Sequence, residues 1–241
     1  MVPAILLVLT ITFTLIHLAP GDPIYAIIGE FPASEEYVRQ VRTEFGLDKP
    51  LHVQFVIYVG KILRGDLGYS YKYRQSVSEL IIERIPATLL LQGLAWGLAI
   101  LLGVFLGVAS SKRPYSIVDN VTTTASLMGF SLPIFWLAMV FLLIFSLRAG
   151  WFPSGGMISL RGAPTDLPGQ ILDLLQHLAL PVTTLGITRL ALITRLTRTS
   201  MLEKKVEDFV LTARAKGLSE DTVHRKHVLR NALLPVVTII G

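Results

Sequence analysis

Two long stretches of the chain contain no charged residue. They cover residues 87–111 and 120–147, and the short segment between them carries Lys112, Arg113 and Asp119. A helix rises about 1.5 Å per residue, so about 20 apolar residues cross the hydrocarbon core of a bilayer. Both stretches are long enough, and we therefore predict membrane-spanning helices at about 87–110 and 121–147.

Three further apolar segments predict additional spans, at 2–18, at about 174–193 and at 232–241. The last covers ten residues, about half of the hydrocarbon core. The pattern therefore predicts a chain truncated at this end, and the apolar start at Met1 predicts the same at the other. The expected fold class is all-α, a polytopic membrane helical bundle formed by a single domain, residues 1–241.

Composition supports a membrane protein and excludes several kinds of site. Charged residues make up 16% of the chain, against about 25% in soluble domains, and the mean hydropathy is +0.60. The net charge of +5 is explained by the Lys and Arg that collect in cytoplasmic loops, so nucleic acid is not an expected partner. The absence of cysteine excludes disulfides, cysteine nucleophiles and thiolate metal sites.

The distribution of charge between the spans predicts their orientation. Lys112 and Arg113 stand in a short loop without an acid, and residues 195–231 hold nine basic against five acidic residues. Both segments are expected on the cytoplasmic side. Residues 19–86 hold eight basic and nine acidic residues and are expected outside, as is the segment 148–173.

The outer loop contains signals for local helices. A first helix is predicted from Ser34, with Gly46 as the left-handed residue after its end. A second helix is predicted from Pro50 to about Arg64. Ser76 begins a capping box for a third, short helix that enters the next span.

Known catalytic and metal motifs do not occur in the sequence. There is no Walker A loop, no His-Glu-x-x-His helix and no Gly-x-Ser-x-Gly elbow. His224 and His227 form an i, i+3 pair, but no carboxylate completes a metal shell, and a solvated basic face is the preferred interpretation. We expect no cofactor, metal or catalytic residue in this chain.

Arg189 is the one charged residue inside a predicted span. A charge within the membrane is a candidate functional residue, so Arg189 is a candidate for the pathway or gate. It is also expected near the cytoplasmic end of its span, where an Arg can extend to the headgroups. The predicted spans contain no Asp or Glu, which argues against transport driven by a proton or sodium gradient.

Glycine and proline in the spans predict two structural features. Gly93-x-x-x-Gly97 and Gly103-x-x-x-Gly107 have the spacing of close helix–helix contacts, with the partner open. Pro133 is expected to kink the third span, because it removes a backbone hydrogen bond.

The cytoplasmic stretch 207–235 predicts a helix-turn-helix. The first helix runs through Lys216, Gly217 interrupts it, and Ser219 caps the second. A rigid element of this kind suits mechanical contact with a cytosolic partner. The residues alone leave open a second interpretation, a basic loop that serves only the orientation of the chain.

At this stretch the chain resembles the permeases of ATP-binding-cassette importers of the dipeptide, oligopeptide and nickel group. Ala213 and Gly217 match the Glu-Ala-Ala, three residues, Gly pattern of their coupling loop, whereas Leu211 and Thr212 stand where the pattern has Glu and the first Ala. The Leu-Pro ending comes later than in the general pattern, as it does in the peptide group, at 234–235. The resemblance assigns the contact with the ATPase to Asp208, Thr212, Ala213, Arg214, Ala215, Lys216, Gly217, Leu218 and Ser219.

The resemblance extends over the whole chain. Five further segments are similar to the first permease subunit of that group: Ala19–Pro23 (APGDP), Gly65–Gly68 (GDLG), Arg84–Leu91 (RIPATLLL), Ser131–Trp136 (SLPIFW) and Arg195–Glu203 (RLTRTSMLE). It implies the transmembrane architecture of a type I importer with about six spans, in the inner membrane of a prokaryote. The implied partners are a second permease, two cytosolic ATPases that bind ATP and Mg²⁺, an extracytoplasmic solute-binding protein, a peptide substrate and membrane lipid.

Alternatives stay open on the sequence alone. An ion-driven carrier or channel, or a membrane scaffold, would also be polytopic and helical. Within the family, members that carry nickel, glutathione or another small solute resemble the peptide members closely. The chain itself is expected to be a transport subunit and not an enzyme.

Overall fold

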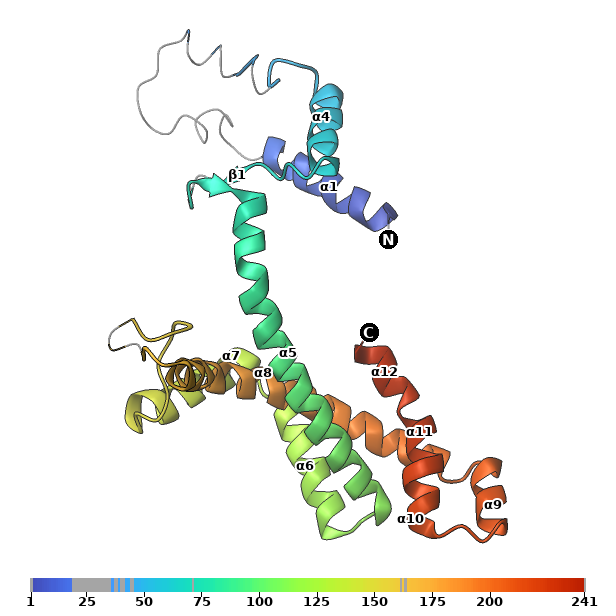
Figure 1. Ribbon diagram of the computed structural model, residues 1–241. Helices are drawn as coiled ribbons and strands as arrows, with labels where there is room; N and C mark the ends of the chain where they lie inside the picture. Colours follow the sequence, from blue (N-terminus) through green and yellow to red (C-terminus); the bar gives the residue numbers. More distant parts are fainter. Residues whose placement is uncertain are drawn as a thin grey trace. The chain divides into compact units, whose positions relative to one another are not determined.

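The computed structural model describes residues 2–18, 36, 39, 42–43, 46–70, 72–160, 162 and 164–240. The regular secondary structure of the described chain is helical apart from one very short hairpin (Figure 1). The chain divides into two compact units, Met1–Pro86 and Ala87–Gly241. The all-α membrane bundle predicted from the sequence is confirmed.

The described part of the first unit contains two apolar helices, the hairpin and the start of a third helix. Helix α1 covers Val2–Leu18 and helix α4 covers Leu51–Leu63. They meet at His17, whose Nε2 lies 3.0 Å from Oε1 of Gln54, and at an aromatic contact between their side chains. Strands β1 (Tyr69–Ser70) and β2 (Gln75–Ser76) pair antiparallel.

The predicted helix ends in this unit are confirmed where they are described. Gly46 has φ +67° and Gly65 has φ +82°, and at each the glycine amide and the next amide donate to carbonyls of the preceding turn. This is the Schellman closure that glycine permits. Ser76 Oγ accepts from the Glu79 amide at 3.1 Å, as a helix cap should. The predicted helix start at Ser34 and the segment 19–23 lie outside the described residues.

Helix α5 (Val77–Lys112) is continuous over 36 residues. The helix that Ser76 starts and the second predicted span are therefore one element, and Pro86 lies inside it. Proline removes one helical hydrogen bond, a loss that apolar transmembrane helices tolerate.

The third predicted span is broken. Helix α6 (Ile117–Ser131) ends before Pro133, and helix α7 (Ile134–Phe141) continues directly into the π-helix η1 (Leu142–Arg148). The segment Ile134–Arg148 is bent by 101° relative to α6. The kink predicted at Pro133 is confirmed, and the bend breaks the helix predicted at 121–147 into two parts. By length and composition, α5 and α8 can each cross a membrane, and the bent pair supplies a third candidate among the described helices.

Helix α8 (Leu167–Lys204) is the longest element, with 38 residues. Asp166 caps it by accepting from the Gly169 amide at 3.0 Å, and it continues through Pro181. The helix extends beyond the predicted span of 174–193 at both ends. Residues 195–204, predicted to belong to the cytoplasmic loop, are therefore a rigid continuation of a membrane helix.

Five short elements complete the second unit, and all lie at the C-terminal end of the chain in Figure 1. They are helix α9 (Asp208–Ala215), α10 (Glu220–Thr222), the π-helix η2 (Val223–Val228), α11 (Leu229–Ala232) and α12 (Leu234–Ile240). The predicted helix-turn-helix is confirmed, and its second arm runs without a loop into the start of the predicted fifth span.

Glycines bring helices α5 and α8 together. A Cβ on Gly103 would lie 2.9 Å from Ile193, and one on Gly107 would lie 2.6 Å from Thr197, closer than carbon atoms can approach. The second predicted glycine motif therefore packs against α8. Gly93 and Gly97 face no atom within 4 Å in the described part of the chain.

Candidate functional site

The turn after helix α9 depends on the backbone conformation of Gly217. Its φ is +76°, its amide donates to the Arg214 carbonyl at 2.9 Å, and the Leu218 amide donates to the Ala213 carbonyl at 3.4 Å. These two bonds form a Schellman motif. Among the described residues no atom lies within 4 Å of a Cβ built at Gly217, so the requirement for glycine comes from the left-handed backbone and not from crowding.

An ion pair spans the Gly217 turn and fixes the angle between its two arms. Arg214 donates from Nε to Glu220 Oε1 at 2.7 Å and from Nη2 to Oε2 at 3.2 Å. This hydrogen bond lowers the pKa of the Glu220 carboxyl, so the pair is charged at neutral pH. Ser219 Oγ accepts from the Thr222 amide at 3.4 Å and caps the second arm, as predicted.

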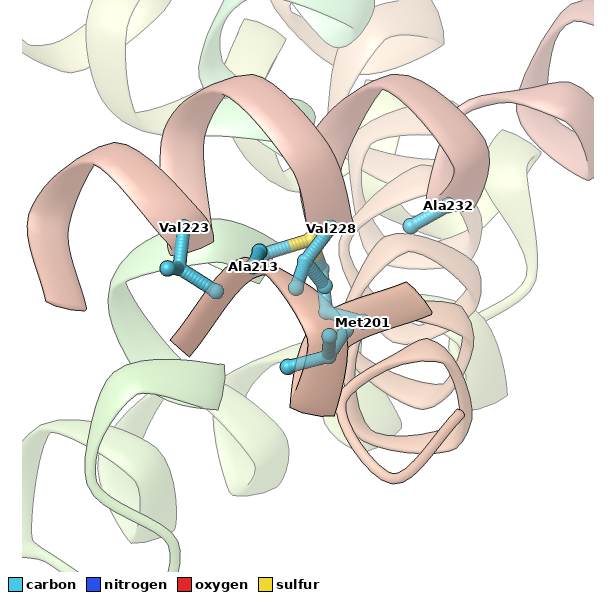
Figure 2. Close-up of a cluster of buried hydrophobic side chains, with 6 residues drawn as sticks. Met201, Ala213, Val223, Val228 and Ala232 are labelled. Carbon is cyan, nitrogen blue, oxygen red and sulfur yellow. The ribbon is translucent and has the colours of Figure 1, made fainter. Parts of the chain in front are cut away.

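An apolar cluster, the loop core, attaches the helix-turn-helix to the end of helix α8 (Figure 2). Each member is at most 5% exposed, and together they come from α8, α9, η2 and α11. The loop core consists of Met201, Val210, Ala213, Val223, Val228 and Ala232. A packed interior of this kind does not deform gradually, so the helix-turn-helix and the end of α8 form one rigid piece.

The residues that the resemblance assigned to ATPase contact divide into two groups. Ala213 is 5% exposed and belongs to the loop core. The other eight are exposed: Asp208, Thr212, Arg214, Ala215, Lys216, Gly217, Leu218 and Ser219. Two apolar side chains of the same segment that the resemblance did not assign, Val206 and Leu211, are 79% and 58% exposed. Helical periodicity places Asp208, Leu211, Thr212 and Ala215 on one face of the helix. Leu211 could have been predicted from this pattern.

His224 does not lie on a solvated basic face, and that prediction is wrong. Its side chain is 6% exposed, and Nε2 lies 3.4 Å from Ser111 Oγ near the end of helix α5. Burial lowers the pKa of His224, and the nearby Lys205 and Lys112 lower it further. The described residues contain no cluster of three His, Cys, Asp or Glu side chains suited to a metal.

Arg189 of helix α8 is held by two side chains of helix α5. Its Nη2 donates to Gln92 Oε1, and its guanidinium lies 4.7 Å from the centre of the Trp96 ring. Its Nη1 is buried and has no partner among the described residues. The residue is 15 positions from the end of α8, about 22 Å along the helix. Helix α8 therefore continues well beyond Arg189, and its predicted place near the cytoplasmic end of the span stays a prediction.

A second ion pair joins helix α6 to helix α8, and sequence reasoning missed it. Arg198 binds both carboxylate oxygens of Asp119, with Nη2 2.8 Å from Oδ2, and Asp119 is 2% exposed. The Tyr115 amide also donates to this carboxylate at 2.8 Å. The partners are 79 residues apart, so no spacing rule connects them, although Asp119 was recognised at the edge of a span.

Comparison with known proteins identifies the family. Residues 99–241 match the family described as binding-protein-dependent transport system inner membrane component, and residues 1–92 match the corresponding N-terminal family. A protein of Brucella suis described as a peptide permease is 46% identical over 98% of this chain and 73% of its own length.

Two further relatives carry more specific descriptions. The di/tripeptide transport system permease protein of Pseudomonas aeruginosa is 39% identical, over all of this chain and 76% of its own length. The oligopeptide transport system permease protein of Bacillus subtilis is also 39% identical, over all of this chain and 74% of its own length. The chain therefore belongs to the family of inner-membrane components of binding-protein-dependent transport systems.

Proposed function

We propose that this chain is one of two permease subunits that form the peptide pathway of an ATP-binding-cassette importer. The peptide substrate is supported by relatives described as di/tripeptide and oligopeptide permeases. In this proposal two cytosolic ATPases bind ATP and Mg²⁺, and an extracytoplasmic protein delivers the peptide. The chain changes its conformation and thereby opens the pathway. It catalyses no covalent reaction.

The observation that carries the proposal is the loop core. A loop that served only the orientation of the chain would need exposed Lys and Arg and no apolar interior. Here Val210 and Ala213 of α9 are buried against Met201 of α8. A force applied to α9 therefore acts on a membrane helix.

The surface that receives this force is the outer side of α9. Leu211, Thr212 and Ala215 share one face of the helix, and Leu211 is 58% exposed. An exposed apolar side chain beside small neighbours suits insertion into a groove of a protein partner. When ATP closes the ATPase pair, this face moves with its partner, and α8 changes its position between inward and outward access.

An ion-driven carrier is not favoured, because the buried acids of the described helices are already engaged. Asp119 is paired with Arg198, and Asp173 accepts from the amide and hydroxyl of Ser159 at 2.8 and 2.6 Å. A carboxylate that carries a coupling ion must exchange its partner in each cycle. A bidentate pair with Arg resists that exchange.

Arg189 is proposed as the pathway residue of this chain. Gln92 and Trp96 hold its guanidinium, while Nη1 is buried and has no partner in the part of the chain that the structure describes. A buried cationic N–H without an acceptor is costly, and a carboxylate or carbonyl presented by a passing peptide would satisfy it. We expect Arg189→Gln to reduce peptide uptake at unchanged membrane abundance. Arg189→Lys should retain more uptake than Arg189→Gln, and equal uptake in both variants and wild type would contradict the role.

An assay of the energy source that drives peptide uptake tests the proposal as a whole. Vesicles that contain this chain with its partner subunits should take up peptide when ATP is supplied on the ATPase side. Uptake should persist when a protonophore collapses the pH gradient. Vesicles loaded with a non-hydrolysable ATP analogue provide the control and should take up none. Uptake that follows an imposed pH gradient without ATP would refute the proposal in favour of a carrier.

A further inference from the structure

An apolar groove with a cationic end runs along the last three turns of helix α5. Its volume is about 990 Å³. The α5 residues that line it stand at positions i, i+3, i+4 and i+7, which is one face of the helix, and α6 and α11 complete the walls. The apolar lining includes Leu101, Val104, Phe105, Val108, Ile117 and Leu229.

Three cations, Lys112, Arg113 and Arg225, line one end of the groove. Lys112 and Arg225 share one acid, Asp221, at 3.4 and 3.1 Å. Arg113 makes no ion pair with a described residue. No Asp or Glu is among the described residues that line the groove, so its end carries a net positive charge.

The smaller cavity beside this end does not neutralise it. It adds Lys205, Glu220 and His224 to the surroundings of Lys112 and Arg113. Lys205 donates to the carbonyls of Ser111 and Lys112 at 3.3 and 3.4 Å. Glu220 is occupied by its pair with Arg214.

The dimensions of the groove match one leaflet of a bilayer. Leu101 and Lys112 are 11 residues apart, which corresponds to about 17 Å along a helix. Half of a hydrocarbon core of about 30 Å is about 15 Å. A molecule with an acyl chain beside Leu101 and Phe105 would therefore hold its headgroup at the level of Lys112 and Arg113.

We propose that this groove is a binding site for one anionic phospholipid of the inner leaflet. The acyl chains lie along the apolar face of α5, and Arg113 binds the phosphate together with Lys112 and Arg225. Basic pockets between membrane helices on the cytoplasmic side recognise anionic headgroups in this way. The proposal rests on the proposed function only in placing Lys112 at the cytoplasmic surface. Because Arg225 belongs to η2, the bound lipid also contacts the second arm of the helix-turn-helix.

The test measures lipid retained by the purified transporter complex in native mass spectrometry. The complex is exchanged into detergent with equal amounts of phosphatidylglycerol and phosphatidylcholine. Each Lys or Arg near a membrane surface raises the affinity for anionic lipid about fivefold. Arg113→Gln with Arg225→Gln should therefore reduce phosphatidylglycerol retention about 25-fold and leave phosphatidylcholine retention unchanged.

Two control variants separate a built site from general charge and from misfolding. Lys226→Gln with Arg230→Gln removes the same charge from exposed positions that do not line the groove, and retention should stay within twofold of wild type. Arg113→Lys with Arg225→Lys keeps the charge and should retain the lipid. Equal retention of both lipids by wild type, or equal loss in both Gln pairs, would overturn the proposal. Crosslinking of a cysteine placed at Leu101 to the second permease would also overturn the proposal, because a protein would then occupy the groove. Since no outcome depends on ATP or uptake, failure of the proposed transport function would not affect this test.

Discussion

The backbone of Gly217 allows a sharp test of the coupling turn. With φ at +76°, the residue occupies the left-handed region, which costs a non-glycine residue about 1–2 kcal/mol and is an outlier for a β-branched side chain. No atom lies within 4 Å of the position where a Cβ would stand. Gly217→Val therefore strains the backbone without a clash. Gly217→Asn is the matched control, because Asn adopts the left-handed region readily.

The size of the effect expected for Gly217→Val is set by the strain in the turn and not by the membrane helices. A cost of 1–2 kcal/mol changes a population ratio by a factor of about 5–30. We expect Gly217→Val to lower the ratio of molecules with the native angle between α9 and η2 to molecules without it by this factor. Uptake and ATPase association should fall together, while Gly217→Asn stays close to wild type. Insertion and membrane abundance should be nearly normal in both variants, because α5 and α8 are unchanged.

The assay measures peptide uptake and ATPase pull-down, each normalised to the permease present in the membrane. Near wild-type values for Gly217→Val in both measurements would show that the turn is not part of a coupling element. An equal loss in Val and Asn would also contradict the reasoning, since it would assign the effect to the added side chain and not to the backbone.

Three further predictions concern topology, pH and the helix α6–α8 ion pair. Cysteines at Lys61 and Lys204, probed with an impermeant thiol reagent in intact cells, should be labelled at 61 and not at 204; the reverse would refute the topology. Because the pKa of His224 is lowered below its ordinary 6.5, the unfolded loop binds more protons. Loop stability should be full above about pH 6.5 and should fall below it, as measured by hydrogen exchange, and His224→Gln should flatten this dependence. Asp119→Asn leaves the half-buried Arg198 guanidinium without its ion pair and should cost about 1–3 kcal/mol of stability in thermal unfolding; adding Arg198→Met should recover part of the loss, and no recovery would mean that the two residues act separately.

Features decided by local backbone chemistry could be read from the sequence. The left-handed closures at Gly46, Gly65 and Gly217 depend on a few adjacent residues, and all three follow the sequence pattern. The spans were recognisable because the membrane requires long uncharged stretches. Helix ends were less accurate: α8 continues to Lys204 because Arg and Lys are good helix formers, and charge alone does not end a helix.

Features decided by contacts between distant segments could not be read from the sequence. Arg189 and Gln92 are 97 residues apart, and His224 and Ser111 are 113 residues apart. Whether a histidine in a basic segment is solvated or buried depends on which helix end it meets. Pro133 predicted a kink but not its size. The 101° bend also depends on how α7 packs against α8.

The loop core connects α9 physically to helix α8, as the proposed coupling requires. Met201 belongs both to this core and to α8, so a displacement of α9 must either break a packed interior or move the helix. Packed interiors switch between discrete arrangements and do not stretch. Along α8, Met201 stands 12 residues from Arg189, about 18 Å. A rotation or shift of this helix therefore changes how Arg189 meets Gln92 and Trp96 of α5. The buried Nη1 that lacks a partner in this arrangement is the group whose environment such a movement would alter.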